Sequence, residues 1–461
     1  MTAIHNLTAQ ALSSAYRAKQ LSPVEVAEAA LARIAAWETK INAMYVVDEA
    51  GARAQASASE ARWRVGVPLS ALDGVPITIK DNIAVAGLPA PLGTAAGDMS
   101  SCAQDAPPVA RVREAGCVLL GKTTMPDYGM LVSGVSSLHG TSRNPWNTTS
   151  NPGGSSSGAG AGMAAGYAPL ALGTDIGGSV RLPAAYNGVF ALKPSLGRVP
   201  ISPPFLGRVV GPITRTAGDA ALLMATLAQP DIRDFMALPY EKIAWGSLDG
   251  DVAGVKLGLV LDIGAGTRPQ PAVRAAIEAA AAAFERAGAI VEPVAPFATP
   301  EMMAGLDGFF QARLWAEVEG LAPDRRAKIL PFIVAWCQRA AKLTAADAAR
   351  NFALVMQIRE KAVAATAPYD FLISPTSPIT AYPATEATPG DDPEKPFEHI
   401  AFTVPFNMSE QPAASLCAGH DADGLPIGLQ IVGHRFDDLG VLRMARAYET
   451  LRPPPRPWPA P

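Results

Sequence analysis

An uncharged run of small and polar residues between Asn144 and Thr174 sets the strongest limit on how this chain can fold. The run lacks the sustained apolar residues of a membrane span, so we expect no membrane partner. Within it, the serines Ser155 to Ser157 follow two glycines, and hydroxyls need hydrogen-bond partners when they are buried. A polar surface loop is one interpretation. Because the neighbouring residues are small and uncharged, we favour a tightly packed, hydrogen-bonded wall.

Apolar strands and amphipathic helices alternate on both sides of this run. We predict strands over 75–79, 118–121, 255–261, 289–291, 370–374 and 427–432. Helices are predicted after the Ser22-Pro23-Val24-Glu25 capping sequence, over 271–287 and over 344–365. This pattern indicates an α/β fold with a large, mostly parallel or mixed sheet covered by helices on both faces. Without an internal repeat or a long linker, we expect one domain over 1–461, ending in a proline-rich, extended or frayed tail over 452–461.

Composition excludes several classes of protein. Among 461 residues, 49% are hydrophobic and 17% charged, which allows a deep core. The net charge is −4 and neither sign forms a block, so we expect a small-molecule partner and no nucleic acid. The four cysteines lie far apart without a CxxC pair, which argues against a disulfide framework or zinc site and favours the cytoplasm. The amino terminus lacks the pattern of a signal peptide.

The segment GTDIGGSVR at 173–181 has the elements of a nucleophile site. Two glycines before Ser179 let successive backbone N–H groups point inward and form an anion-binding nest. A serine hydroxyl beside such donors is what acyl transfer requires. Taken alone, the segment would favour an ordinary glycine-rich turn or a helix C-cap.

Lys80 ends the apolar strand predicted over 75–79. Lysines in that position usually reach solvent. If the amine is buried instead, its pKa falls from about 10.4 toward neutrality and it can act as a general base, which a serine nucleophile needs.

Three segments in a fixed order resemble the amidase signature family: GVPITIKDN at 74–82, NPGGSSSGAG at 151–160 and GTDIGGSVR at 173–181. The likeness covers nearly the whole chain, because RNPW, GVFALKP, DFLISPT and GLPIGLQIVG also match. The family's spacing between its bridging serine and its nucleophile is the spacing between Ser155 and Ser179. The resemblance implies the amidase-signature fold, with a signature core over about 74–195.

The resemblance also implies a role for each matched residue. Lys80 matches the base, Ser155 the bridging serine in a cis peptide with Gly154, and Ser179 the nucleophile. The N–H groups of Ile176, Gly177, Gly178 and Ser179 match the oxyanion loop, and Asp175 a residue that holds this loop. Arg181 either locks the loop, which we prefer, or meets a substrate carboxylate. Supporting or pocket-lining positions are expected at Thr174, Gly129 and Met130, and from 309 to 336. Ser157 departs from the family, which commonly has glycine there. No cofactor or metal is required.

We therefore expect hydrolysis of a small, uncharged carboxamide through an acyl-enzyme on Ser179, by a free-standing protein or a homodimer. One alternative is the glutaminase subunit of a tRNA-dependent amidotransferase, which Ile400-Ala401 disfavours because that branch has an aspartate there. Another is an α/β-hydrolase esterase, since residues 154–158 fit G-x-S-x-G and His420 or His434 follows. A dinucleotide site at Gly160-Ala161-Gly162 and a non-enzymatic subunit are weaker alternatives.

Overall fold

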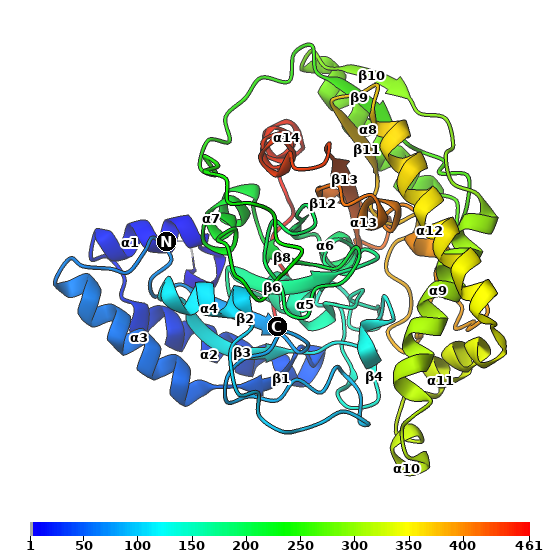
Figure 1. Cartoon of the computed structure of the whole chain (residues 1–461). Helices are drawn as coiled ribbons and strands as arrows, with labels where there is room; N and C mark the ends of the chain where they lie inside the picture. The colour runs from blue at the N-terminus through cyan, green and yellow to red at the C-terminus, as the bar shows by residue number, and fades with distance from the viewer. Residues whose placement is uncertain (1–2) are drawn as a thin grey trace.

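The computed structural model describes residues 3–461, which are built around one 11-stranded sheet (Figure 1). From edge to edge, the strands lie in the order β1-β3-β2-β6-β8-β7-β12-β13-β11-β9-β10. Their bounds are β1 Met44–Val47, β2 Pro76–Lys80, β3 Val118–Thr123, β6 Leu170–Asp175, β7 Phe190–Lys193, β8 Val209–Thr214, β9 Lys256–Leu259, β10 Ile290–Pro293, β11 Phe371–Pro375, β12 Ala413–His420 and β13 Pro426–Val432. A separate hairpin pairs β4, Val135–Ser136, with β5, Gly140–Thr141.

The sheet is mixed. Strand β2 runs parallel to β3 and β6, and β9 runs parallel to β10 and β11, whereas the pairings through β8, β7, β12 and β13 are antiparallel. The predicted α/β class is thus confirmed in its mixed form. Every strand predicted above is present, with ends shifted by at most two residues.

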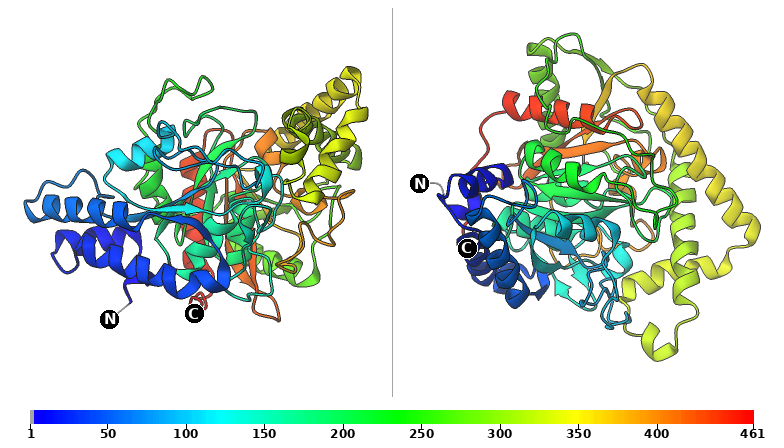
Figure 2. Two further views of the ribbon diagram at one scale, coloured as in Figure 1. Left: turned by 90° about the horizontal axis from the view of Figure 1, so that it is seen from below. Right: turned by 60° about the vertical axis from the view of Figure 1, so that its left-hand side comes forward.

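Helices cover both faces of the sheet. They are α1 Ala9–Arg17, α2 Pro23–Ile41, α3 Glu49–Arg64, α4 Pro107–Glu114, α5 Ser157–Ala165, α6 Arg181–Asn187, α7 Ala217–Leu227, α8 Pro271–Arg286, α9 Pro300–Val318, α10 Pro323–Arg326, α11 Pro331–Cys337, α12 Ala345–Thr366, α13 Pro405–Met408 and α14 Asp438–Leu451. The main apolar core lies between the sheet and α1, α4, α7, α8 and α14, and α5 and α6 pack on the opposite face. Helices α1 to α3 lie at one side of the molecule, and α9, α11 and α12 at the other (Figure 2).

Local sequence signals explain where these helices begin. The predicted capping box at α2 is present, with the Ser22 N–H donating to Glu25 Oε2 at 2.8 Å and the Glu25 N–H donating to Ser22 Oγ at 3.2 Å. Helix α12 likewise begins at a capping box, formed by Thr344 and Asp347. Within the described residues, no helix combines the length and apolarity needed to cross a bilayer.

The proline-rich tail is extended and attached to the body of the protein. The Arg33 side chain donates to the Pro459 carbonyl at 3.0 Å, and the Arg215 guanidinium lies 4.6 Å from the centre of the Trp458 ring. Of the two predicted forms, extended or frayed, the structure has the extended one, because these contacts replace the helical hydrogen bonds that its prolines cannot make.

Candidate active site

The carboxyl ends of two parallel strands bring the first site residues together. Strands β2 and β6 are neighbours, with Ile79 paired to Leu172, so Lys80 at the end of β2 lies beside the end of β6. Ile77 and Ile79 point into the main core, and the alternation of the strand turns Lys80 toward the opposite face. Strand geometry therefore directs a lysine into the protein instead of into solvent.

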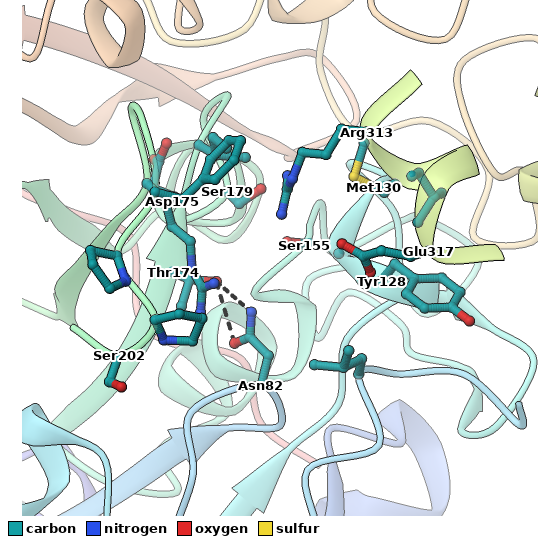
Figure 3. Close-up of a pocket in the computed structure, with 18 of the residues that line it drawn as sticks. Asn82, Tyr128, Met130, Ser155, Thr174, Asp175, Ser179, Ser202, Arg313 and Glu317 are labelled. Atoms are coloured by element: carbon teal, nitrogen blue, oxygen red, sulfur yellow. Dashed lines mark hydrogen bonds between the residues drawn. The ribbon is translucent and has the colours of Figure 1, made fainter. Parts of the chain in front are cut away.

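Lys80 is fully buried. Its Nζ lies 2.8 Å from Ser155 Oγ and 2.8 Å from Thr174 Oγ1. The Asn82 amide also donates to that threonine oxygen, at 3.1 Å (Figure 3). Burial lowers the pKa of Lys80 well below its ordinary value; Asp175 opposes this effect and the nearby charge of Arg208 adds to it. The amine is therefore neutral far below pH 10, and a neutral amine can accept a proton.

Ser155 and Ser179 come from two adjacent loops. Ser155 precedes α5 and follows a cis peptide bond with Gly154, and Ser179 lies between β6 and α6. The Ser156 N–H donates to the Ser179 carbonyl at 3.1 Å, which holds the loops together. Both serines are nearly buried and line the same pocket. Within residues 3–461 no hydrogen bond joins their two hydroxyls, so only the Lys80–Ser155 contact is already formed.

The serine run is the hydrogen-bonded wall that its composition predicts. Ser155, Ser156 and Ser157 are all buried. Ser156 Oγ donates to the Thr174 carbonyl and Ser157 Oγ to the Thr124 carbonyl, each at 3.3 Å. Ser157, the departure from the family pattern, therefore ties the start of α5 to the chain after β3.

Asp175 fixes the loop that carries Ser179. Its carboxylate accepts hydrogen bonds from the Gly178 N–H at 2.7 Å, the Val180 N–H at 3.1 Å and the Asn407 amide at 2.8 Å. Burial alone would raise the pKa of Asp175, but the charge and hydrogen bonds of Arg181 lower it below its ordinary value. The carboxylate thus stays ionised and bound to the loop.

The N–H groups expected to form the oxyanion set differ in whether they already have an acceptor. The Gly178 N–H already donates to Asp175, because the loop curls back toward the end of β6. In the described chain, the N–H groups of Ile176, Gly177 and Ser179 have no protein acceptor. The free donors of the loop are therefore these three.

Arg181 has no donor left for a substrate. Its guanidinium donates to Asp175 through Nε and Nη2, to the Thr403 carbonyl and the Gln430 side chain through Nη1, and to Asn407 through Nη2. These bonds use all five N–H groups of a fully buried side chain. The structure thus agrees with the preferred, loop-locking interpretation. Sequence reasoning missed Thr403, Asn407 and Gln430, because no local pattern connects them to residue 181.

Two glycines allow the close packing of the loops. Gly178 has φ +124°, and a Cβ there would lie 2.5 Å from Thr403 Oγ1. Gly129 has φ +68°, and a Cβ there would lie 3.2 Å from Ser155 Oγ. Side chains at these positions would displace the segments around both serines.

The serines open into a cavity of about 570 Å³. Gly129 and Met130 line it, as predicted, and α9 contributes Arg313, Leu314 and Glu317 from the predicted 309–336 region. Figure 3 shows Arg313 and Glu317 pointing from α9 into this cavity. The turn before β8 adds Phe205 and Arg208, which the sequence did not indicate. The pocket therefore has apolar walls and two arginines.

The alternative sites find no support. Ser156, the serine of the G-x-S-x-G match, follows no strand and has no histidine partner in the described chain, whereas an esterase elbow requires both. Gly160-Ala161-Gly162 lies inside the buried helix α5, where no phosphate could reach its backbone. Over residues 3–461, no cluster of three or more metal-ligating side chains is present.

Comparisons with known proteins agree with this geometry. The sequence profile of the family named Amidase matches residues 25–442. An acylamidase of Rhodococcus erythropolis is 33% identical, covering 98% of this chain and 96% of its own. The A subunit of the glutamyl-tRNA(Gln) amidotransferase of Myxococcus xanthus is 35% identical, covering 96% and 97%.

Solved structures give the same result. A bacterial aryl acylamidase of the amidase signature family superposes with a TM-score of 0.90 at 31% identity, covering 97% of this chain and 96% of its own. A 6-aminohexanoate cyclic dimer hydrolase bound to its substrate gives 0.88 at 28% identity, with 97% of each chain covered. This chain therefore belongs to the amidase signature family, and it is an amidase.

Proposed function

We propose that the chain hydrolyses a small carboxamide with Ser179 as nucleophile, Ser155 as proton carrier and Lys80 as base. One observation carries this proposal: a fully buried lysine with a depressed pKa lies 2.8 Å from a serine hydroxyl in the wall of a pocket that a second serine also lines. Burial lowers the pKa of this lysine, and a neutral amine within hydrogen-bond distance of a hydroxyl can act as its general base.

The first half of the reaction forms a tetrahedral intermediate on Ser179. Neutral Lys80 takes the proton of the Ser155 hydroxyl while Ser155 takes the proton of Ser179, whose Oγ bonds to the carbonyl carbon. The carbonyl oxygen becomes an oxyanion, and the free N–H groups of the 176–179 loop donate to it. Loss of one such donor typically costs about 2.7–4 kcal/mol of transition-state stabilisation.

The second half returns both protons. The C–N bond breaks as Ser155 gives its proton to the amide nitrogen and regains one from the Lys80 ammonium, so the amine leaves neutral. A water molecule then attacks the ester on Ser179 by the same proton route and releases the carboxylic acid. Direct protonation of the leaving nitrogen matters because an amine anion is too basic to leave.

Active-site labelling tests these assignments. A fluorophosphonate should attach to Ser179, located by peptide mass spectrometry, and Ser179→Ala should remove the label together with amidase activity. Lys80→Ala should retain the fold and label at least a hundredfold more slowly, since the base is lost. Rapid labelling of the Lys80→Ala variant on Ser179 would contradict the proposal.

A second candidate is the glutaminase subunit of a tRNA-dependent amidotransferase, because several A subunits of that kind are among the similar proteins. The residues near the loop favour the free-standing amidase. Ile400 packs so that its Cδ1 would lie 3.3 Å from a Cβ at Gly177, and Ala401 is buried in an apolar cluster, so no carboxylate is present there to read an amino group. Amide hydrolysis by the purified chain alone, without tRNA, is the expected result.

We propose three further features. A single sheet contains strands from β1 to β13, which supports one domain over 1–461. All four cysteines are unpaired, which fits a cytoplasmic setting. We expect activity as a monomer or a homodimer, which light scattering of the purified protein would measure.

A further inference from the structure

We propose that the amide this pocket accepts carries a carboxylate, which Arg313 and Arg208 bind away from the scissile bond. This inference rests on the function proposed above and adds its substrate class. It differs from the uncharged substrate expected from the sequence, because the apolar segments around 309–336 gave no sign that two guanidinium groups would meet in the cavity.

The two arginines reach the pocket from separate elements. Arg313 lies on α9, and its guanidinium carbon is 4.2 Å from the centre of the Phe205 ring. The Arg208 N–H donates to the Phe205 carbonyl at 3.1 Å, so one turn supplies both the aromatic ring under Arg313 and the second arginine. Stacking on a ring fixes the plane of a guanidinium and leaves its edge free to donate.

Arg208 also lies close to the reacting groups. Val209 pairs with Asp175 across β8 and β6, so Arg208, one residue before Val209, lies beside the start of the 176–179 loop. Both Arg208 and Ser179 line the cavity. An anion held by Arg208 would thus be a short distance from a carbonyl seated at the loop.

Among residues 3–461, neither guanidinium is paired directly with a carboxylate, and the charge of Glu317 acts on both at longer range. In the part of the chain that the structure describes, neither side chain forms an ion pair or a hydrogen bond. Glu317, one helical turn after Arg313, also lines the pocket but is exposed and beyond ion-pair distance. Burial lowers the pKa of Arg208 to about 10; the charge of Arg313 adds to this effect and the charge of Glu317 opposes it.

The balance of charge in the cavity is therefore positive. Burial disfavours the charged form of Lys80, Asp175 is paired with Arg181, and one exposed carboxylate, Glu317, faces two half-buried guanidiniums. Half-buried cations without a partner are costly unless a ligand supplies the anion. Two guanidiniums at one site match a carboxylate better than a neutral or cationic group. The cavity of about 570 Å³ limits the ligand to a small molecule.

Two matched amide series test the inference. In the first, the acyl group varies: anilides of pentanoic, glutaric and 5-aminopentanoic acid. In the second, the amine varies: acetanilides with a 4-methyl, 4-carboxylate or 4-aminomethyl group. We expect the anionic member to have at least tenfold higher kcat/KM than its neutral partner in one series, with the cationic member slowest. Glutarate and benzoate should also slow fluorophosphonate labelling of Ser179.

Variants assign the effect to the arginines. In Arg313→Gln and in Arg208→Gln, the ratio of anionic to neutral kcat/KM should fall at least tenfold and protection by carboxylates should disappear, whereas Arg313→Lys should keep part of both. Arg350→Gln removes an exposed arginine outside the pocket and should change neither. Labelling of Ser179 without ligand reports whether each variant is folded.

Each result decides one question. Preference for neutral or cationic amides, or a preference that survives both glutamine variants, would overturn the inference and leave the amidase mechanism intact. Labelled enzyme without turnover of any anilide and without protection by carboxylates would also overturn it. Failure of Ser179 to label in the wild type would instead refute the proposed function.

Discussion

Replacing Lys80 with methionine separates the catalytic and structural effects of this residue. The amine is fully buried and its pKa is depressed, so unfolding takes up a proton at any pH between the folded pKa and about 10.4. Because the folded pKa lies below the unfolded one, wild-type stability falls as pH falls through this window, and Lys80→Met removes that fall. The stability difference, variant minus wild type, should therefore grow by about 1.4 kcal/mol for each unit that pH decreases.

This slope does not depend on contacts that the substitution breaks. Loss of the hydrogen bonds to Ser155 and Thr174 adds a constant penalty of about 1–3 kcal/mol for each unsatisfied group, independent of pH. For 461 residues, an unfolding entropy of about 2.1 cal/mol/K per residue converts the slope to about 1.4 °C in Tm per pH unit. Thermal melts of both proteins from pH 8 to pH 10 would measure it.

Activity distinguishes Lys80 from a buried lysine without a catalytic role. Turnover of Lys80→Met should fall by about 10²–10⁴ or more, the usual contribution of a general base. Lys122 is the matched control: it is buried on the neighbouring strand, burial lowers its pKa to about 8, and its amine donates to the Asp81 carbonyl at 2.6 Å. Lys122→Met should show a similar slope above pH 8 yet keep its turnover. A flat Tm difference for Lys80→Met would refute a neutral buried amine, and near-wild-type turnover would refute the base.

Three further substitutions test the loops. Ser155→Ala should lower turnover and labelling of Ser179 at least a hundredfold, because the proton path is cut, whereas Ser156→Ala should be milder; the reverse order would favour an esterase elbow. Gly178→Ala should lower kcat at least a hundredfold, because its Cβ would meet Thr403. Gly66→Ala, also at positive φ but with no atom near its Cβ, should keep kcat. Equal effects of the two substitutions would show that the backbone angle φ alone matters. Asp175→Asn should cost about 3–5 kcal/mol in urea unfolding, because it leaves Arg181 buried without its counter-ion, and a loss below 1 kcal/mol would contradict that pairing.

The sequence predicted the proposed catalytic residues and part of the pocket wall, Gly129, Met130 and the 309–336 region, but it did not predict the two arginines of the pocket. Lys80 ends an apolar strand, and strand periodicity with burial suffices to place it. The glycines of the Ser179 loop predict its backbone conformation from the local sequence alone. Arg208 and Arg313 give no such signal, because each becomes part of a pocket only when α9 and the turn before β8 meet in the fold. The sequence also could not show that the Gly178 N–H donates to Asp175, because this contact depends on how the loop curls back toward β6.

Arg208 lines the pocket and also acts on Lys80, so its substitution should have an effect that substitution of Arg313 lacks. Its charge helps to lower the pKa of Lys80, and Arg313 does not act on Lys80 in this way. Removing the charge in Arg208→Gln should therefore raise the pKa of Lys80 and move the rising limb of the kcat profile to higher pH, while Arg313→Gln should change KM for anionic amides and leave that limb in place. A bound carboxylate should act in the same direction as Arg208→Gln, because it offsets the same positive charge. The rising limb of the wild type should then lie at higher pH for the anionic amide than for its neutral partner. If kcat rose at the same pH for the two amides, the charge of the substrate would have no effect on the pKa of Lys80.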